Sequence, residues 1–237
     1  EHNITVDVIC GSSMGSVIAA LWALGYKISD IEELAKKFGK LLRSFSFFGL
    51  SIPFKGLVRS KHLERICKKI FGNKTFYDVK HTLKIVAFDF TTKQATVIDS
   101  GPIYKAVAAS CAMPGIFEPV KFKEEFLLDG GILNPLPTRI LLNYNVSKVI
   151  AVNITPTQEE ICREYQRHNK HHIFDFIFGS IETMQREFIN KALLLADVVI
   201  HPNLEGIGWM EFEKADEIIK RGKIATIEKI EEIKQLE

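Results

Sequence analysis

The chain of 237 residues lacks several features that would assign it to a class directly. It has no apolar run of the roughly 18 residues that a membrane-spanning helix needs. Lys and Arg (31) nearly balance Asp and Glu (29), so the charge gives no sign of a nucleic-acid partner. The cysteines form no CxxC pair and no Cys/His spacing suited to zinc, so we expect reduced thiols; they are Cys10, Cys67, Cys111 and Cys162.

Length and element pattern favour a single α/β domain over residues 1–237, because nothing in the chain marks a second domain. Strands are predicted over residues 83–89, 95–99 and 149–154, with helices over residues 16–24, 61–71 and 103–112. A closing amphipathic helix over residues 216–234 is expected to be interrupted near Gly222. This alternation of strands and helices is typical of an α/β fold.

The stretch that begins the chain has the layout of a nucleophile elbow. A β-branched strand runs through Gly11-Ser12-Ser13-Met14-Gly15 directly into an apolar helix. We expect Ser13 at the tight turn, with Gly11 and Gly15 removing Cβ atoms that would clash as strand and helix approach. The helix N-terminus would favour an alkoxide and an oxyanion. The alternatives are a turn that only packs the helix on a sheet, and a turn that binds phosphate.

A second stretch carries a carboxylate in an unusual setting. Residues 126–128 form a hydrophobic strand that ends at Asp129, followed by Gly130 and Gly131. Because the two glycines have no side chains, another segment of backbone can approach Asp129 closely. The alternatives are an aspartate that bonds its own turn and one that caps a helix.

A serine nucleophile needs a neighbouring base, and histidine is the usual one. His201 follows Asp129 at the end of a predicted strand, which fits the Ser, Asp, His order of α/β-hydrolases. No supporting motif surrounds His201. A Ser/Asp/His esterase therefore stays an alternative at this point.

Two aromatic segments, residues 45–54 and 174–178, stand out among the seventeen phenylalanines. They would suit an acyl-chain wall, a lid or contact with a membrane surface, whereas the plainer interpretation is a loop that covers the core. Between them, His168, His171 and His172 lie close together. If this segment is helical, Glu164, His168 and His172 share a face, which raises a metal hypothesis. The basic neighbours favour a solvated helix face instead.

Taken together, the motifs resemble those of the bacterial patatin-like phospholipase family. The resemblance rests on the elbow, on Asp129-Gly130-Gly131 followed by Asn134-Pro135-Leu136-Pro137, and on residues 109–117 and 196–202. It spans nearly the whole chain, with the motifs in the family's order.

The resemblance implies a three-layer α/β/α fold with a largely parallel central sheet. It implies a dyad of Ser13 as nucleophile and Asp129 as base, acting through an acyl-enzyme on lipid esters as a phospholipase A or lysophospholipase, with neither a metal nor a cofactor required. The motif-supporting residues would be Gly11, Ser12, Met14, Gly15, Gly130 and Gly131. The implied partner is a lipid or acyl-ester substrate, with peripheral membrane contact, and the expected location is cytoplasmic or peripheral to a membrane.

One element of the family pattern has no counterpart in the sequence. Members carry a GGGxxG-type loop after an initial strand, and its N–H groups form the oxyanion hole. We therefore expect the chain to lack a strand, loop and helix of roughly 30 residues, the size of a βα unit. Since one oxyanion donor is worth about 10²- to 10³-fold in rate, the chain alone is expected to be weak or inactive. The alternative is a non-catalytic lipid-binding or regulatory protein.

Overall fold

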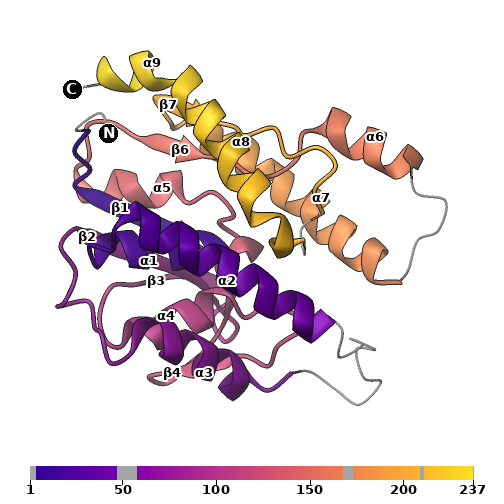
Figure 1. Ribbon diagram of the computed structural model, residues 1–237. Coiled ribbons are helices and arrows are strands. Elements are labelled where there is room, and N and C mark those ends of the chain that lie inside the picture. Colours follow the sequence, from indigo (N-terminus) through magenta and orange to yellow (C-terminus); the bar gives the residue numbers. More distant parts are fainter. Residues whose placement is uncertain (1–3, 47–57, 168–172, 209–210, 237) are drawn as a thin grey trace.

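The computed structural model describes residues 4–46, 58–167, 173–208 and 211–236. Its strands form a five-stranded and a two-stranded sheet with helices packed around them (Figure 1), which confirms the predicted α/β class. In chain order the elements are β1 (Val8–Ser12), α1 (Met14–Ala23), α2 (Ile28–Ser46), α3 (Ser60–Phe71), β2 (Thr82–Asp89), β3 (Gln94–Ile98), α4 (Ile103–Ser110), β4 (Val120–Phe122), β5 (Glu125–Asp129), the 3₁₀ helix η1 (Gly130–Ile132), α5 (Thr138–Leu141), the 3₁₀ helix η2 (Leu142–Tyr144), β6 (Ile150–Val152), α6 (Gln158–Arg167), α7 (Ile173–Leu193), β7 (Val198–Ile200), the 3₁₀ helix η3 (Phe212–Lys214), α8 (Ala215–Glu228) and α9 (Ile230–Lys234).

The larger sheet is built around β2. Strand β1 pairs with β2 in parallel, while β3 and β5 pair with it antiparallel and β4 extends the sheet from β5. Strands β6 and β7 form a separate parallel pair. The sheet is therefore mixed rather than purely parallel.

Helices cover both faces of this sheet. Gly11 of β1 faces α1, because a Cβ on Gly11 would lie 2.5 Å from the carbonyl oxygen of Gly15. Successive residues of a strand face opposite sides, so Cys10 and its β2 partner Lys84 face away from α1. On that side, the Lys84 Nζ lies 4.2 Å from the ring centroid of Tyr144 in η2. The sheet thus lies between α1 on one face and the α5–η2 segment on the other.

The main core lies between the larger sheet and the helices α1 and α4. In α4 the side chains of Ala106, Val107, Ala108 and Ala109 are fully buried. Their small size lets α4 sit close to the sheet and to α1. A smaller cluster joins β7 to α8 and α9 through Val198, Ile200, Ala225 and Ile233.

Helices α2 and α8 each continue through a glycine residue. Helix α2 continues through Gly39 because α2 packs against η3 there, where a Cβ on Gly39 would lie 2.1 Å from the carbonyl oxygen of Phe212. The closing helix is interrupted at Lys229, between α8 and α9, and the expected break near Gly222 is wrong. Of the aromatic segment at residues 45–54, only the first two residues are described, at the end of α2.

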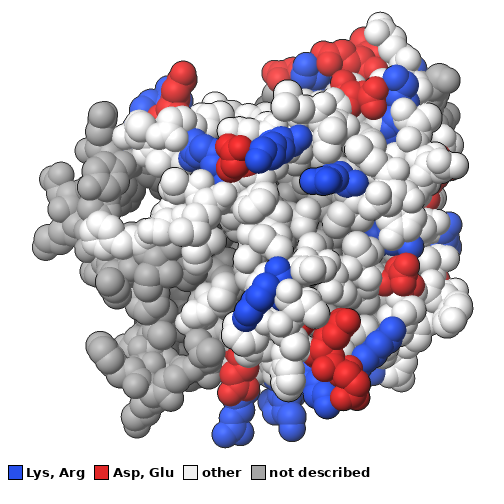
Figure 2. All heavy atoms as spheres, turned by 180° about the vertical axis from the view of Figure 1, so that it is seen from behind, with Lys and Arg blue, Asp and Glu red and all other residues white. Residues whose placement is uncertain are grey.

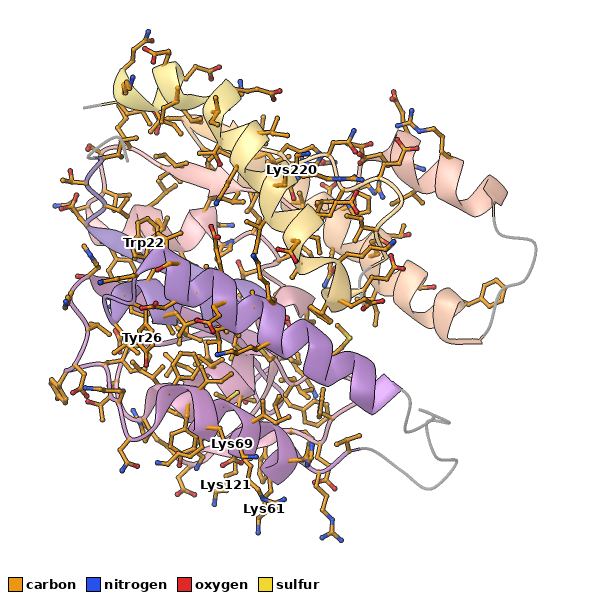
Figure 3. The ribbon with its side chains drawn as sticks, in the orientation of Figure 1. Trp22, Tyr26, Lys61, Lys69, Lys121 and Lys220 are labelled. Atoms are coloured by element: carbon orange, nitrogen blue, oxygen red, sulfur yellow. The ribbon has the colours of Figure 1, made fainter. Side chains whose placement is uncertain are left out.

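The surface combines charged and apolar groups. On the reverse face, much of the area is formed by uncharged residues, with Lys, Arg, Asp and Glu gathered mainly towards the upper and lower borders (Figure 2). Trp22, in the last turn of α1, and Tyr26, just after that helix, are partly exposed, and Lys61 and Lys69 of α3 are exposed (Figure 3). Within the described residues, no helix is both long enough and apolar enough to span a bilayer.

Candidate active site

Two strands meet head-on along one edge of β2 and bring the two predicted site residues together. Residues 85 and 86 of β2 pair with both β1 and β3, and residues 87–89 pair with both β3 and β5. Strands β1 and β5 must therefore share the edge opposite β3. Ser12 pairs with Val86 and Asp129 with Ala87, so the two strands end at adjacent positions. Ser13 and Asp129, 116 residues apart, come into contact there.

The elbow places Ser13 in a conformation that few non-glycine residues adopt. Its φ of 51° and ψ of −129° lie between the end of β1 and the start of α1 at Met14. Gly11 is required because its Cβ would meet the backbone of Gly15 and Ser16. The expectation for Gly15 is wrong in its reason: a Cβ on this exposed residue would meet no atom within 4 Å. Of the two glycines, only Gly11 is therefore needed for the close approach of strand and helix.

The Ser13 hydroxyl donates a hydrogen bond directly to the Asp129 carboxylate, with 2.6 Å between Oγ and Oδ2. The second carboxylate oxygen, Oδ1, accepts the Gly131 N–H at 2.8 Å. Asp129 is only 5% exposed. Burial raises the pKa of Asp129 from 3.8 to about 6, against the opposing effect of the two hydrogen bonds. The carboxylate is thereby a stronger base than an ordinary aspartate, yet it stays mostly ionised at neutral pH.

The two glycines after Asp129 allow this approach of backbone. A Cβ on Gly130 would lie 2.2 Å from the carbonyl oxygen of Val86 and 2.8 Å from the Ser12 Oγ. The Ser12 hydroxyl is buried and has no hydrogen-bond partner among the described residues. A Cβ on Gly131 would lie 3.0 Å from the Asp129 Oδ1. The turn that holds the carboxylate is therefore compatible with glycine and with little else.

Sequence reasoning missed two side chains that contact this site. Ser110, at the end of α4, accepts the Ser13 N–H at 2.9 Å through its Oγ. Gln185 of α7 donates from Nε2 to the Gly131 carbonyl oxygen at 2.7 Å. Ser110 lies inside residues 109–117, one of the segments that carry the family resemblance. Nothing else in the sequence indicated that Ser110 contacts the site. Nothing in the sequence indicated Gln185, because its contact with Gly131 depends on how α7 packs.

The alternative base, His201, lies in different surroundings. Its Nδ1 is 2.9 Å from the carbonyl oxygen of Asn153, and its Nε2 is 4.0 Å from the Glu160 Oε2. It follows β7, in the smaller sheet, and lines a cavity of about 630 Å³ together with residues of α8. The structure thus places a carboxylate, and not this imidazole, against the Ser13 hydroxyl.

The histidines of the metal hypothesis lie outside the residues that the structure describes, since His168, His171 and His172 all fall in the gap at residues 168–172. Among the described residues, no group of three or more His, Cys, Asp or Glu side chains is placed to hold a metal ion.

Comparisons with known proteins bear on this geometry. The patatin-like phospholipase family matches residues 1–142, which include both the elbow and the Asp-Gly-Gly turn. The chain belongs to the patatin-like phospholipase family. The matched part of this patatin-like chain runs from β1 to the start of η2. It contains the strands and turns that carry Ser13 and Asp129, whereas α7, which carries Gln185, lies outside it.

Relatives of the patatin-like chain include much longer proteins. Lysophospholipase NTE1 of Candida albicans is 29% identical over 167 residues, covering 70% of this chain and 12% of that protein. Lysophospholipase NTE1 of Scheffersomyces stipitis is 30% identical over 167 residues, covering 70% and 11%. An uncharacterised NTE family protein of Mycobacterium tuberculosis is 29% identical over 157 residues, covering 66% and 27%. The chain thus spans about a tenth to a quarter of these relatives.

Proposed function

We propose that the chain is the catalytic domain of a serine acyl hydrolase that cleaves carboxylic esters of lipids, of the phospholipase A or lysophospholipase type. The observation that carries the proposal is the 2.6 Å hydrogen bond from the Ser13 Oγ to a buried Asp129 carboxylate. Family membership and the printed names of the two NTE1 relatives support a lipid substrate. No further side chain is needed to activate the serine.

In the first half-reaction, Asp129 takes the Ser13 proton while Oγ bonds to the ester carbonyl carbon. The tetrahedral intermediate then collapses, the bond to the leaving oxygen breaks, and that oxygen takes the proton from Asp129. In the second half-reaction, water gives a proton to Asp129 and its oxygen attacks the acyl carbon. Collapse releases the fatty acid and returns the proton to Ser13. A pKa of about 6 suits both the acceptance and the return of the proton.

The oxyanion needs N–H donors near Ser13. The amide of Ser13 itself is bonded to Ser110, whereas the first N–H groups of α1, on Met14 and Gly15, have no acceptor within the helix. We propose these as part of the oxyanion site. We further propose that a glycine-rich loop completes it, carried by a strand that pairs with the edge of β1 opposite β2, where no strand lies among the described residues.

We also propose that the substrate is taken from a lipid surface that α7 contacts peripherally. Phe176, Met184 and Phe188 expose 57%, 70% and 40% of their surface along this helix, which also supplies Gln185 to the site. Replacing Met184 and Phe188 by serine should weaken sedimentation with phosphatidylcholine vesicles but spare turnover of a soluble ester. Equal vesicle binding by the double variant would remove α7 from the proposal.

The test is hydrolysis of phosphatidylcholine, lysophosphatidylcholine and a short p-nitrophenyl ester by the full-length protein. Ser13→Ala and Asp129→Asn should each abolish turnover, and a fluorophosphonate should label Ser13. His201→Ala should retain turnover. Normal turnover in either dyad variant would refute the proposal, and a wild-type protein that neither turns over nor reacts with the probe would favour a non-catalytic role.

A further inference from the structure

The hydroxyl of Ser110 joins the nucleophile's backbone to the central strand. Ser110 is fully buried, and its Oγ lies 2.9 Å from the Ser13 amide nitrogen and 2.6 Å from the Val86 carbonyl oxygen. An amide N–H only donates and a carbonyl oxygen only accepts. The hydroxyl must therefore donate to Val86 and accept from Ser13, so the direction of both bonds is fixed.

Both groups that Ser110 joins belong to the geometry of the dyad. Ser13 has a φ of 51°, a strained value that needs support from its surroundings. Val86 is the β2 residue that pairs with Ser12, and its neighbour Ala87 pairs with Asp129. Ser110 thus ties the strained residue to the strand that aligns both members of the dyad.

The segment that follows Ser110 holds the other member of the dyad. The carbonyl oxygen of Ala112, two residues further on, accepts the Asp129 N–H at 3.0 Å. Residues 110–112 therefore bond to the backbone of Ser13 through a side chain and to the backbone of Asp129 through a carbonyl. A shift of this segment would change the separation of the two catalytic groups.

We propose that Ser110 is a positioning residue of the dyad, whose hydroxyl fixes the Ser13 amide so that Oγ stays in contact with the Asp129 carboxylate. This inference rests on the proposed acyl-hydrolase function. Misplacement of a reacting group by about 1 Å is enough to cost about 10²-fold in rate. Ser110→Ala should therefore lower kcat for a soluble ester by about 10²-fold and leave KM within about twofold.

Ser16 supplies a matched control. It is also a fully buried serine, and its Oγ donates to the Ser13 carbonyl oxygen at 2.6 Å. That carbonyl oxygen also accepts the Ser16 N–H at 2.9 Å, so Ser16→Ala leaves it bonded. Ser16→Ala should keep kcat within about threefold of the wild type, although it removes the same atom from the same core.

The pH profile separates positioning from a general loss of stability. The hydrogen bond from Ser13 lowers the pKa of Asp129, so its loss in Ser110→Ala should move the acid limb of kcat/KM to higher pH. The groups that face Asp129 are the Ser13 hydroxyl, the Gly131 N–H and the Cys111 thiol, whose pKa burial raises well above 9.0. None of these three titrates in the range of the acid limb.

The experiment measures p-nitrophenyl butyrate hydrolysis by the full-length protein and its Ser13→Ala, Ser16→Ala, Ser110→Ala and Ser110→Cys variants, with thermal melting of each. Low kcat with a shifted acid limb in Ser110→Ala, and an intermediate kcat in Ser110→Cys, supports the inference. Wild-type kcat in Ser110→Ala, or an equal loss in Ser16→Ala, overturns it. If Ser110→Ala does not fold, Ser110→Cys takes its place, because sulfur is a weak acceptor. A lowered kcat in Ser110→Cys then supports the inference, and a wild-type kcat overturns it. Residual wild-type activity in Ser13→Ala would instead refute the proposed function.

Discussion

Replacing Asp129 by asparagine should abolish activity and at the same time stabilise the fold. Burial raises the pKa of Asp129 from 3.8 to about 6, so the folded protein holds an ionised carboxylate where it favours a neutral group. The free-energy cost of keeping this buried carboxylate ionised is fully present above the folded pKa of about 6. It disappears as the pH falls through 3.8, the pKa in the unfolded chain. The difference between the two pKa values lowers the free energy of unfolding by about 3 kcal/mol at pH 8 and by about 1 kcal/mol at pH 4.5. Asparagine removes that cost and still offers an oxygen to the Gly131 N–H.

The assay is urea unfolding of the wild type and Asp129→Asn at pH 8 and pH 4.5. Asp89→Asn is the matched control, because Asp89 is also a buried aspartate at the end of a strand in the same sheet. Hydrogen bonds from Thr92 and Thr91 lower the pKa of Asp89, so the same substitution should destabilise the protein at pH 8. An Asp129→Asn variant that is less stable than the wild type at pH 8, or whose gain does not shrink at pH 4.5, would contradict the assigned burial cost.

Three further predictions follow from the site. The kcat/KM for a soluble ester should fall about tenfold for each pH unit below 6, because only ionised Asp129 accepts the Ser13 proton; a profile flat down to pH 4.5 would refute this. Gly11→Ala should lower the melting temperature sharply, since its Cβ would lie 2.5 Å from a carbonyl oxygen, whereas Gly15→Ala should melt at or slightly above the wild-type temperature; equal melting of both would contradict the packing of the elbow. Gln185→Ala should lower kcat by up to about tenfold, the worth of one hydrogen bond to the Gly131 carbonyl, while the exposed Glu187→Ala should not.

The local parts of the site could be predicted because short-range chemistry determines them. A strand, a tight turn and a helix around Ser13 follow from residues that lie within a few positions of one another. The same holds for the hydrophobic strand that ends at Asp129 and for the two glycines after it. The role of Gly15 was misjudged, because Gly15 lies in the first turn of α1 with open space where its Cβ would be, whereas Gly11 of β1 faces that turn.

The rest of the site depends on contacts between distant segments. Ser110 and Gln185 are ordinary polar residues in the sequence, and only the packing of α4 and α7 brings them to Ser13 and Gly131. Gly39 is unfavourable in a helix by propensity, yet α2 continues through it because η3 packs closely there. In each case tertiary packing decides the outcome.

The head-on meeting of β1 and β5 makes catalysis sensitive to strand register. Strand β5 contacts β2 through only three paired residues, and Asp129 is the last of them. A slip of one residue would turn the carboxylate to the opposite face of the sheet. A slip that moves Asp129 to the position of Gly130 would also place a side chain against the Val86 carbonyl oxygen, so that pairing is sterically excluded, whereas the opposite slip would bring Gly131 there. Gly130 thus blocks one of the two possible misalignments, and only the observed register brings the Asp129 carboxylate to the Ser13 hydroxyl.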